Sequence, residues 1–173
     1  QKVSRAAVAS VLAASGTVAV LPVNEVKAAN PFTDVNPENF AYNAILDLYE
    51  RNIISGYGNG KFGPNDPVTR GKAAKMLSQV LGLNTDSVEN PNFKDVKTNN
   101  PYYKYIAALA KEGIITGFVD QTYQPDEPIT RGQMAIILTR GFDFKQATKL
   151  THSFEDVTDN TYERFFVQTI YDL

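Results

Sequence analysis

A four-residue motif recurs along this chain at a spacing of 61 residues, and no other feature of the sequence constrains the fold as strongly. The motif Phe-x-Asp-Val begins at Phe32 and returns at Phe93 and Phe154. The same spacing relates residues 53–56 to 114–117 and residues 67–71 to 128–132. A fixed period of this length indicates one supersecondary unit copied in tandem, in which each copy buries its apolar face against its neighbours.

The period divides the chain into segments 32–92, 93–153 and 154–173, which we call the first, second and third repeats. The third repeat holds only the first part of the unit. We therefore expect the protein to continue beyond Leu173, and we expect its true start to precede Gln1.

Each repeat is predicted to open with a turn and a first helix. Tyr42, Ile45, Leu48 and Tyr49 have the spacing of one buried helical face. In the second repeat, residues 100–101 read Asn-Pro, which predicts an N-cap followed by proline as the first helical residue. Further along each repeat, positions 52 and 113 hold Asn and Gly, which tolerate the left-handed conformation that ends helices.

A second helix is predicted to begin after Thr69 and Thr130, because a threonine at the N-cap accepts a hydrogen bond from a free N–H of the first turn. Gln133 stands where it completes a capping box, whereas Lys72 at the equivalent position cannot. The apolar face of the second helices comprises Ala73, Met76, Leu77, Val80 and Leu81, then Met134, Ile137, Leu138 and Phe142. Each unit is therefore helix–loop–helix, and the fold class is mainly α.

The N-terminal segment has the order of a secretory signal peptide at 1–28. Lys2 and Arg5 precede an apolar stretch at 6–21, and residues 26–28 place small side chains at the −3 and −1 positions of a cleavage site. An ordinary buried helix is the alternative interpretation. A permanent membrane span needs about 20 strongly apolar residues, whereas this stretch is mostly Ala, Ser and Thr.

Charge and composition exclude several classes of site. The chain has a formal net charge of −2, and removal of residues 1–28 takes away three basic residues and one acidic residue, which leaves −4. An acidic chain is a poor partner for nucleic acid or anionic lipid, so an anion must be bound by locally placed donors. The absence of cysteine excludes disulfides and thiolate metal sites.

The ordered motifs resemble the S-layer homology (SLH) domain of bacterial cell-surface proteins. The matching elements are Phe-x-Asp-Val, an aromatic-rich first helix, Gly-Ile-Ile-x-Gly-aromatic, a Phe/Tyr-x-Pro turn, and Thr-Arg at the start of the second helix. The likeness covers residues 32–173 and repeats at constant spacing.

This resemblance implies a fold, a ligand and a location. It implies tandem helix-loop-helix repeats in a pseudo-threefold arrangement with a central helix bundle made by the first helices. It also implies grooves between neighbouring repeats that bind a secondary cell-wall polysaccharide bearing pyruvylated N-acetylmannosamine. The implied function is non-covalent anchoring of a secreted protein in the bacterial cell wall or S-layer, with other S-layer proteins as further partners.

The chain departs from the family pattern at three places. The usual Thr-Arg-Ala-Glu reads Thr-Arg-Gly-Lys at 69–72 and Thr-Arg-Gly-Gln at 130–133. The tryptophan often found at the first helix is replaced by Phe40, and Pro101 stands at the equivalent position of the second repeat. The third repeat lacks its loop, its second helix and its arginine, so the set of grooves is expected to be incomplete.

Arg70 and Arg131 are the main candidates for ligand binding. A guanidinium can hold the planar carboxylate of a ketal-linked pyruvate through two parallel hydrogen bonds, and free N–H groups at a helix N-terminus also attract anions. The alternative interpretation is that both arginines form structural ion pairs with Asp34, Asp95 or Asp156.

Other candidates surround these arginines in the repeat. Tyr57 and Phe118 offer aromatic faces to the C–H groups of a sugar, and they are also expected to pack partly inside the protein. Asp34 and Asp95 are candidates for accepting sugar hydroxyl groups or for holding the turn. The full set of candidate ligand-binding residues is Arg70, Arg131, Lys72, Gln133, Thr69, Thr130, Asp34, Asp95, Tyr57, Phe118, Gly56 and Gly117.

The sequence gives no support for catalysis, and we expect neither a cofactor nor a metal. The single histidine, His152, lies outside the repeated motifs, and adjacent carboxylates sit at turns. Two alternatives to polysaccharide anchoring stay open. The chain is either a structural module for S-layer assembly, or the targeting region of a cell-wall hydrolase whose catalytic domain lies beyond Leu173.

The signal-peptide interpretation predicts cleavage after Ala28, because the small residues of the site are followed by a turn-rich segment. Mass spectrometry of the secreted protein should find Ala29 at the N-terminus. A mature chain that still contains residues 6–21 would contradict the interpretation.

Overall fold

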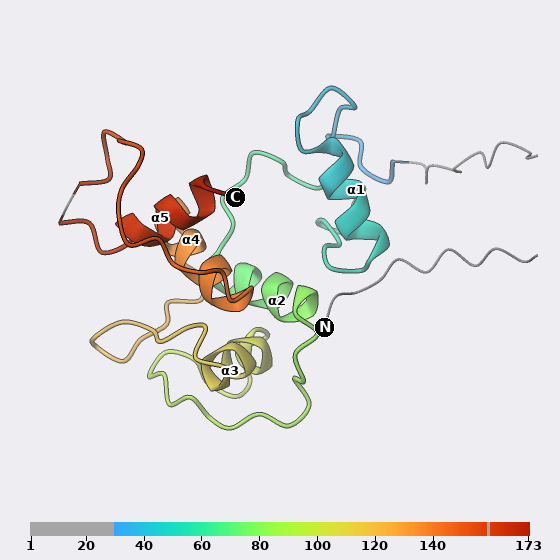
Figure 1. Ribbon diagram of the computed structural model, residues 1–173. Coiled ribbons are helices and arrows are strands. Elements are labelled where there is room, and N and C mark those ends of the chain that lie inside the picture. Colours follow the sequence, from blue (N-terminus) through green and yellow to red (C-terminus); the bar gives the residue numbers. More distant parts are fainter. Residues whose placement is uncertain (1–29, 159) are drawn as a thin grey trace, which may run out of the picture.

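The structure is a computed structural model that describes residues 30–158 and 160–173. The predicted signal peptide and its cleavage site lie outside the described residues. The helices, in chain order, are α1 (Tyr42–Glu50), α2 (Arg70–Val80), α3 (Tyr103–Lys111), α4 (Arg131–Gly141) and α5 (Arg164–Tyr171). The described part of the chain contains no β-strand, and the mainly α prediction is confirmed (Figure 1).

The second helices begin where the threonine caps were predicted. The Thr69 hydroxyl accepts from the backbone N–H of Lys72 at 3.3 Å, and the Thr130 hydroxyl accepts from that of Gln133 at 3.1 Å. The side-chain oxygen of Gln133 in turn accepts from the Thr130 N–H at 3.3 Å, which completes the capping box at α4. These local bonds fix the first turns of α2 and α4.

The first helix of the second repeat begins later than predicted, whereas α1 begins at Tyr42, the first residue of its predicted apolar face. The prediction that Asn100 caps a helix starting at Pro101 is wrong, because the Asn100 side chain accepts from the N–H of Tyr102 at 2.8 Å and closes a turn before the helix. α3 then begins at Tyr103. Asn39 makes the same bond to the N–H of Ala41 at 2.9 Å ahead of α1. Asn side chains commonly mimic a backbone turn in this way.

The predicted ends of the first helices are confirmed. Asn52 has a φ of 57° and Gly113 a φ of 69°, so both residues adopt the left-handed conformation just beyond a helix. The chain then turns inward, and Ile53, Ile114 and Ile115 are buried.

The main core lies around α2, α3 and α4. Ala74 on α2 and Ile106 and Leu109 on α3 are fully buried, and they pack with side chains of the second repeat's loop. The first repeat has a smaller cluster of Phe32, Val35 and Ile45. Tyr49 was expected on the buried face but is 38% exposed, and its ring meets the buried Phe32 ring edge-on.

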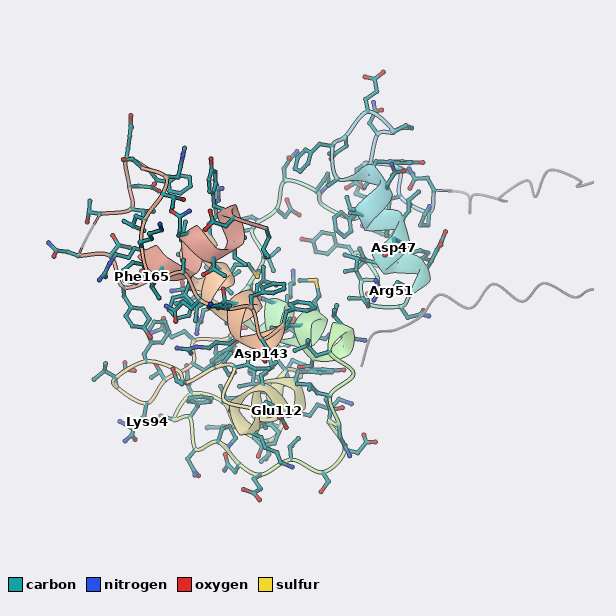
Figure 2. All side chains as sticks on the ribbon, viewed as in Figure 1. Asp47, Arg51, Lys94, Glu112, Asp143 and Phe165 are labelled. Atoms are coloured by element: carbon teal, nitrogen blue, oxygen red, sulfur yellow. The ribbon has the colours of Figure 1, made fainter. Side chains whose placement is uncertain are left out.

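Helices from neighbouring repeats form the closest helix pairs. α2 packs against α3, and α4 packs against α5, whereas α1 stands apart from the other helices (Figure 1). The side chain of Arg51 pairs with Asp47 on the exposed surface of α1 at 3.2 Å (Figure 2). The described residues do not show α1, α3 and α5 gathered in one central bundle, so the pseudo-threefold arrangement stays a prediction.

α5 is docked on α4 through part of its apolar face. Phe166 is buried, and the buried Gln168 side chain accepts from the N–H groups of Thr151 and His152. Val167 and Ile170 follow Phe166 at helical spacing but are only half-buried. They line a groove of about 690 Å³ with residues of α4. Their equivalents in the second repeat, Ile106 and Leu109, are covered by the loop that follows α3.

Deletion of residues 154–173 is expected to lower the melting temperature, because it removes Phe166 and exposes the α4 surface beneath it. Burial of one such side chain contributes roughly 1.5–3 kcal/mol, which is a large part of a small domain's stability. Thermal unfolding and the fluorescence of an apolar dye such as ANS measure both effects. Equal melting temperatures for the full and shortened chains would contradict the docking of α5.

Candidate functional site

The first turn of α2 is docked on the loop of the second repeat. The N–H of Arg70 donates to the carbonyl of Glu127 at 2.8 Å, and the N–H of Gly71 donates to that of Pro125 at 2.7 Å. These are two of the free N–H groups that every helix N-terminus leaves. Carbonyl groups of the second repeat therefore satisfy these N–H groups. They also fix the position from which the Arg70 side chain extends into that repeat.

Gly71 is required at this junction by close packing. A Cβ atom at this position would collide with the ring of Tyr102 and with the carbonyl oxygen of Pro125. The alanine of the usual family motif therefore does not fit here.

The Arg70 side chain crosses from the first repeat into the second and is only 9% exposed. Its Nε donates to the carbonyl of Tyr123 at 2.7 Å, and its Nη1 donates to the Gln133 side-chain oxygen at 2.9 Å. Its Cζ lies 4.7 Å from the ring centre of Phe118 and 4.6 Å from that of Tyr123. Two aromatic faces and two fixed oxygens thus hold the guanidinium in one position.

This buried cation has no carboxylate within 4.0 Å among the residues that the structure describes. The single ion pair in the described residues joins Arg51 and Asp47 on α1. Burial lowers the pKa of Arg70 from its usual value, while Tyr123 and Asp95 act in the opposite direction. Arginine starts from so high a pKa that it stays charged near neutrality. The structural ion pair that was the alternative interpretation of Arg70 is not observed.

Tyr123 is the residue that completes this arrangement, and sequence reasoning did not single it out. Its hydroxyl donates to the carbonyl of Arg70 at 3.1 Å, and it is 1% exposed. Burial raises the pKa of its phenol to about 12, so it is a neutral donor at physiological pH. The sequence signal that could have identified Tyr123 is its hydroxyl, which Phe62 at the equivalent position of the first repeat lacks.

Two cavities open beside the guanidinium. One of about 590 Å³ is lined by Arg70, Asp95, Phe118, Gln124 and the 125–128 turn. The other, of about 360 Å³, is lined by Arg70, Phe118, Gln133 and residues at the start of the third repeat. We call the two together the Arg70 groove.

Asp34 and Asp95 hold the loops of their own repeats. The two carboxylate oxygens of Asp34 accept from the N–H groups of Phe62 and Gly63 at 2.8 and 2.9 Å. Those of Asp95 accept from Tyr123 and Gln124 at 2.8 and 2.6 Å. The Phe62 and Gly63 bonds lower the pKa of Asp34. Of the two roles considered for these aspartates, holding the turn is the one the contacts show.

The equivalent loop of the first repeat lacks an incoming arginine among the described residues. The Tyr57 hydroxyl donates to the Asp66 carboxylate at 2.7 Å, a bond that raises the pKa of the phenol. The Lys72 ammonium lies 5.1 Å from the Tyr57 ring centre, and both residues line a cavity of about 280 Å³. Tyr57 and Lys72 are therefore close together. Their contacts differ from those of Arg70, because the Tyr57 hydroxyl is bonded to a carboxylate and the cation is a lysine.

The sequence pattern of the S-layer homology domain matches residues 31–74 and 92–135 of this chain. The chain belongs to the S-layer homology domain family. The two matched segments contain Arg70 on one side and Phe118, Tyr123 and Gln133 on the other, so the Arg70 groove lies between two SLH repeats.

Curated relatives include surface-layer proteins and wall enzymes. The chain is 41% identical over 122 residues to an endoglucanase of Bacillus sp. (strain KSM-635), an alignment that covers 70% of this chain and 13% of that protein. It is 32% identical over 135 residues to the S-layer protein EA1 of Bacillus anthracis, with coverage of 77% and 16%. It is also 32% identical over 140 residues to an uncharacterized cell wall amidase of Bacillus anthracis, with coverage of 80% and 26%.

The chain thus spans only a small part of the relatives it matches. SLH repeats anchor proteins at the bacterial cell surface, and this chain accordingly has a cell-surface or cell-wall location. No helix in the described residues is long and apolar enough to pass through a membrane. The same residues contain no cluster of acidic and histidine side chains suited to a metal ion.

The two SLH arginines occupy different environments. Arg131 is exposed and makes no side-chain hydrogen bond, ion pair or ring contact within the described part of the chain. It lines the groove with Val167 and Ile170, and Gly132 faces the side chain of Glu163. The structure therefore brings Arg70, Gln133 and Phe118 together and leaves Arg131 outside this group, while Thr130 contacts it only through Gln133.

Gly56 and Gly117 have structural tasks in the SLH loops. Both have positive φ, 63° and 69°, and a Cβ atom at either position would collide with the phenylalanine of its own Phe-x-Asp-Val motif. A backbone carbonyl blocks the same space at both positions. Any contact of these glycines with a ligand stays a prediction.

Asp34→Asn is expected to lower the melting temperature at neutral pH, because an amide cannot accept both N–H groups as a carboxylate does. The folded pKa of Asp34 is below its unfolded value, so its contribution is present above about pH 4 and is lost as the pH falls through the folded pKa. The difference in melting temperature between the two proteins should therefore shrink below about pH 4.

The exposed Asp86 supplies a matched control, since Asp86→Asn removes the same charge away from any SLH loop. A difference between Asp34→Asn and the unchanged protein that is constant from neutral to acid pH would show that the carboxylate charge of Asp34 is unimportant.

Proposed function

We propose that the Arg70 groove binds a carboxylate-bearing cell-wall polysaccharide, the pyruvylated secondary polymer that the family resemblance implies, and so anchors the protein without a covalent bond. The observation that carries this proposal is a charged, nearly buried guanidinium that lies beside open cavities and has no carboxylate partner in the described part of the chain. Leaving a charge buried and unpaired is costly, and an anionic ligand relieves that cost.

The guanidinium has donors to spare. Of its five N–H bonds, one on Nε and one on Nη1 are used by Tyr123 and Gln133. Arg70 lines both cavities. Its remaining donors can match the planar carboxylate of a ketal-linked pyruvate, which accepts two parallel hydrogen bonds. Gln133 replaces the glutamate of the usual family motif, so the guanidinium keeps its full positive charge for the ligand.

The walls of the groove suit a sugar ring. Phe118 is half-buried and offers one aromatic face, while Asp95 and Gln124 provide oxygens that accept from hydroxyl groups. This division between apolar and polar walls is typical of small-ligand sites, where a few polar groups fix the orientation.

The activity of the whole protein is a separate proposal. Relatives include the S-layer protein EA1, an endoglucanase and a cell wall amidase. We infer that these repeats serve either an S-layer protein or a wall-acting enzyme by the same anchoring. A purely structural assembly module would bind other surface proteins instead. Pull-down with purified cell wall, before and after chemical removal of the polysaccharide, separates anchoring from assembly.

Arg70→Ala is expected to weaken binding to purified cell wall by roughly tenfold or more, because a charge-assisted bidentate contact contributes on the order of 1.5–3 kcal/mol. Arg70→Lys should restore only part of the affinity, since lysine lacks the planar fork. Arg131→Ala should have a smaller effect than Arg70→Ala, because Arg131 has neither the aromatic faces nor the fixed oxygens that position Arg70.

Arg51→Ala is the matched control, since Arg51 is an exposed arginine at the C-cap of α1 and pairs with Asp47. Phe118→Ala is a second test that leaves both hydrogen bonds of Arg70 intact. Helical circular dichroism must stay unchanged in each variant. Normal wall binding by folded Arg70→Ala and Phe118→Ala proteins would overturn the proposal.

A further inference from the structure

The tip of the first repeat's loop combines an exposed asparagine with a glycine. Asn59 is exposed, and it is the only asparagine of the chain that is followed by a glycine, Gly60. A Cβ atom at Gly58 would meet nothing within 4 Å, and one at Gly60 would meet only the carbonyl oxygen of Pro31 at 3.9 Å. Asparagine is one of the thermolabile residues, and this one lies where no neighbouring group obstructs a reaction of its side chain.

The equivalent tip of the second repeat is held more firmly. There the N–H of Gln121 donates to the carbonyl of Phe118 at 2.9 Å, and the ammonium of Lys94 (labelled in Figure 2) donates to the carbonyl of Asp120 at 2.9 Å. The N–H of Gly60 makes no hydrogen bond within the described part of the chain. Its nitrogen is therefore available as a nucleophile once base removes its proton.

The side chain of Asn59 is already folded back on the main chain. Its Oδ1 accepts from the N–H of Lys61 at 3.2 Å, so the side chain turns over the intervening residue, Gly60, as in an Asx-turn. When a nucleophile adds to Cγ of an amide, negative charge develops on the amide oxygen. The Lys61 N–H is placed to stabilise that charge, as the donors of an oxyanion hole do.

We propose that Asn59 is a site of spontaneous deamidation, a modification in which water is the co-reactant. The backbone nitrogen of Gly60 forms a bond to Cγ of Asn59, the Cγ–Nδ2 bond breaks, and ammonia leaves with the proton of the Gly60 N–H. The resulting succinimide is opened by water. Cleavage at Cγ gives aspartate, whereas cleavage at the main-chain carbonyl gives isoaspartate. The site lies in the first repeat and does not depend on the proposed function of the Arg70 groove.

The aspartate product has a precedent in this chain. Asp120, the residue equivalent to Asn59, accepts from the hydroxyl and the N–H of Thr122 at 2.7 and 3.0 Å. These bonds lower the pKa of Asp120. An aspartate at position 59 therefore fits the loop, and deamidation gives the first repeat the charged tip that the second repeat has from the start.

The isoaspartate product disturbs the loop, because it adds one carbon to the main chain between residues 59 and 60. The carbonyl of Gly60 accepts from both the N–H and the hydroxyl of Thr33, at 2.8 and 3.1 Å. Thr33 belongs to the first Phe-x-Asp-Val turn. We expect the longer main chain to displace this carbonyl and so to weaken the connection between the loop and the turn.

The test incubates the purified chain at neutral and mildly alkaline pH and follows the modification by peptide mass spectrometry. Trypsin cleaves after Arg51 and Lys61, so residues 52–61 are recovered as one peptide. The mass increase for exchange of NH2 by OH should appear at Asn59, at a rate that rises with pH. Asn52 in the same peptide is an internal control and should stay unmodified, because the N–H of Ile53 after it donates to the carbonyl of Leu48 at 2.9 Å.

Gly60→Gln should slow the reaction by roughly tenfold or more, since a side chain hinders the approach of its own nitrogen to Cγ. The variant is expected to fold, because Gln121 occupies the equivalent position with a φ of 65°. Asn59→Asp should keep the melting temperature of the fresh protein. The incubated protein, which contains isoaspartate, should melt at a lower temperature than Asn59→Asp.

Two results would overturn the proposal. One is a folded chain that stays unmodified under conditions in which the free synthetic peptide 52–61 is deamidated. The other is an equal rate of modification in a folded Gly60→Gln variant, which would show that the nitrogen at position 60 is not the nucleophile. Equal melting temperatures for the incubated protein and Asn59→Asp would contradict the expected disturbance by isoaspartate.

Discussion

The junction between the first two repeats depends on one buried cation. Arg70 joins the start of α2 to the loop that follows α3 through its backbone N–H and its Nε, and to the first turn of α4 through its Nη1. Two aromatic rings enclose its charge. A guanidinium is suited to this position because it can stack and donate in several directions at once. The same contacts that fix the two repeats relative to one another leave part of the charge facing a cavity. Packing and ligand binding are therefore supported by the same side chain.

The two departures from the family motif at positions 71 and 133 both affect the contacts of Arg70 at this junction. Gly71 leaves room for the Tyr102 ring, and Gln133 offers Arg70 a neutral oxygen in place of a carboxylate. A glutamate at position 133 would neutralise the guanidinium within the protein, whereas a glutamine orients it and preserves its charge. The second junction has no equivalent arrangement in the described residues, since Arg131 is exposed and Gly132 faces only the flexible side chain of Glu163.

Local features of this fold could be predicted from the sequence, and long-range ones could not. Thr69, Thr130 and Gln133 cap their helices as expected because caps involve neighbours within one turn. The start of α3 was misplaced because Asn100 closes a turn as readily as it caps a helix. The partner of Arg70 is the carbonyl of a residue 53 positions away, and no spacing rule indicates which carbonyl a long side chain reaches. The family pattern pointed to the arginine, and only the fold supplies its surroundings.

The aspartates of the first two Phe-x-Asp-Val turns accept hydrogen bonds from backbone N–H groups and not from side chains. Asp34 holds Phe62 and Gly63, while Asp95 holds Tyr123 and Gln124, by the same pair of N–H bonds. Because the bonds are made by the main chain, they are the same in both copies although Phe62 corresponds to Tyr123 and Gly63 to Gln124. Loops of this kind can diversify during evolution without refolding, and each duplicated unit is free to acquire its own preference. In this chain the two copies have already diverged, since one loop receives an arginine and the other surrounds a tyrosine–aspartate pair.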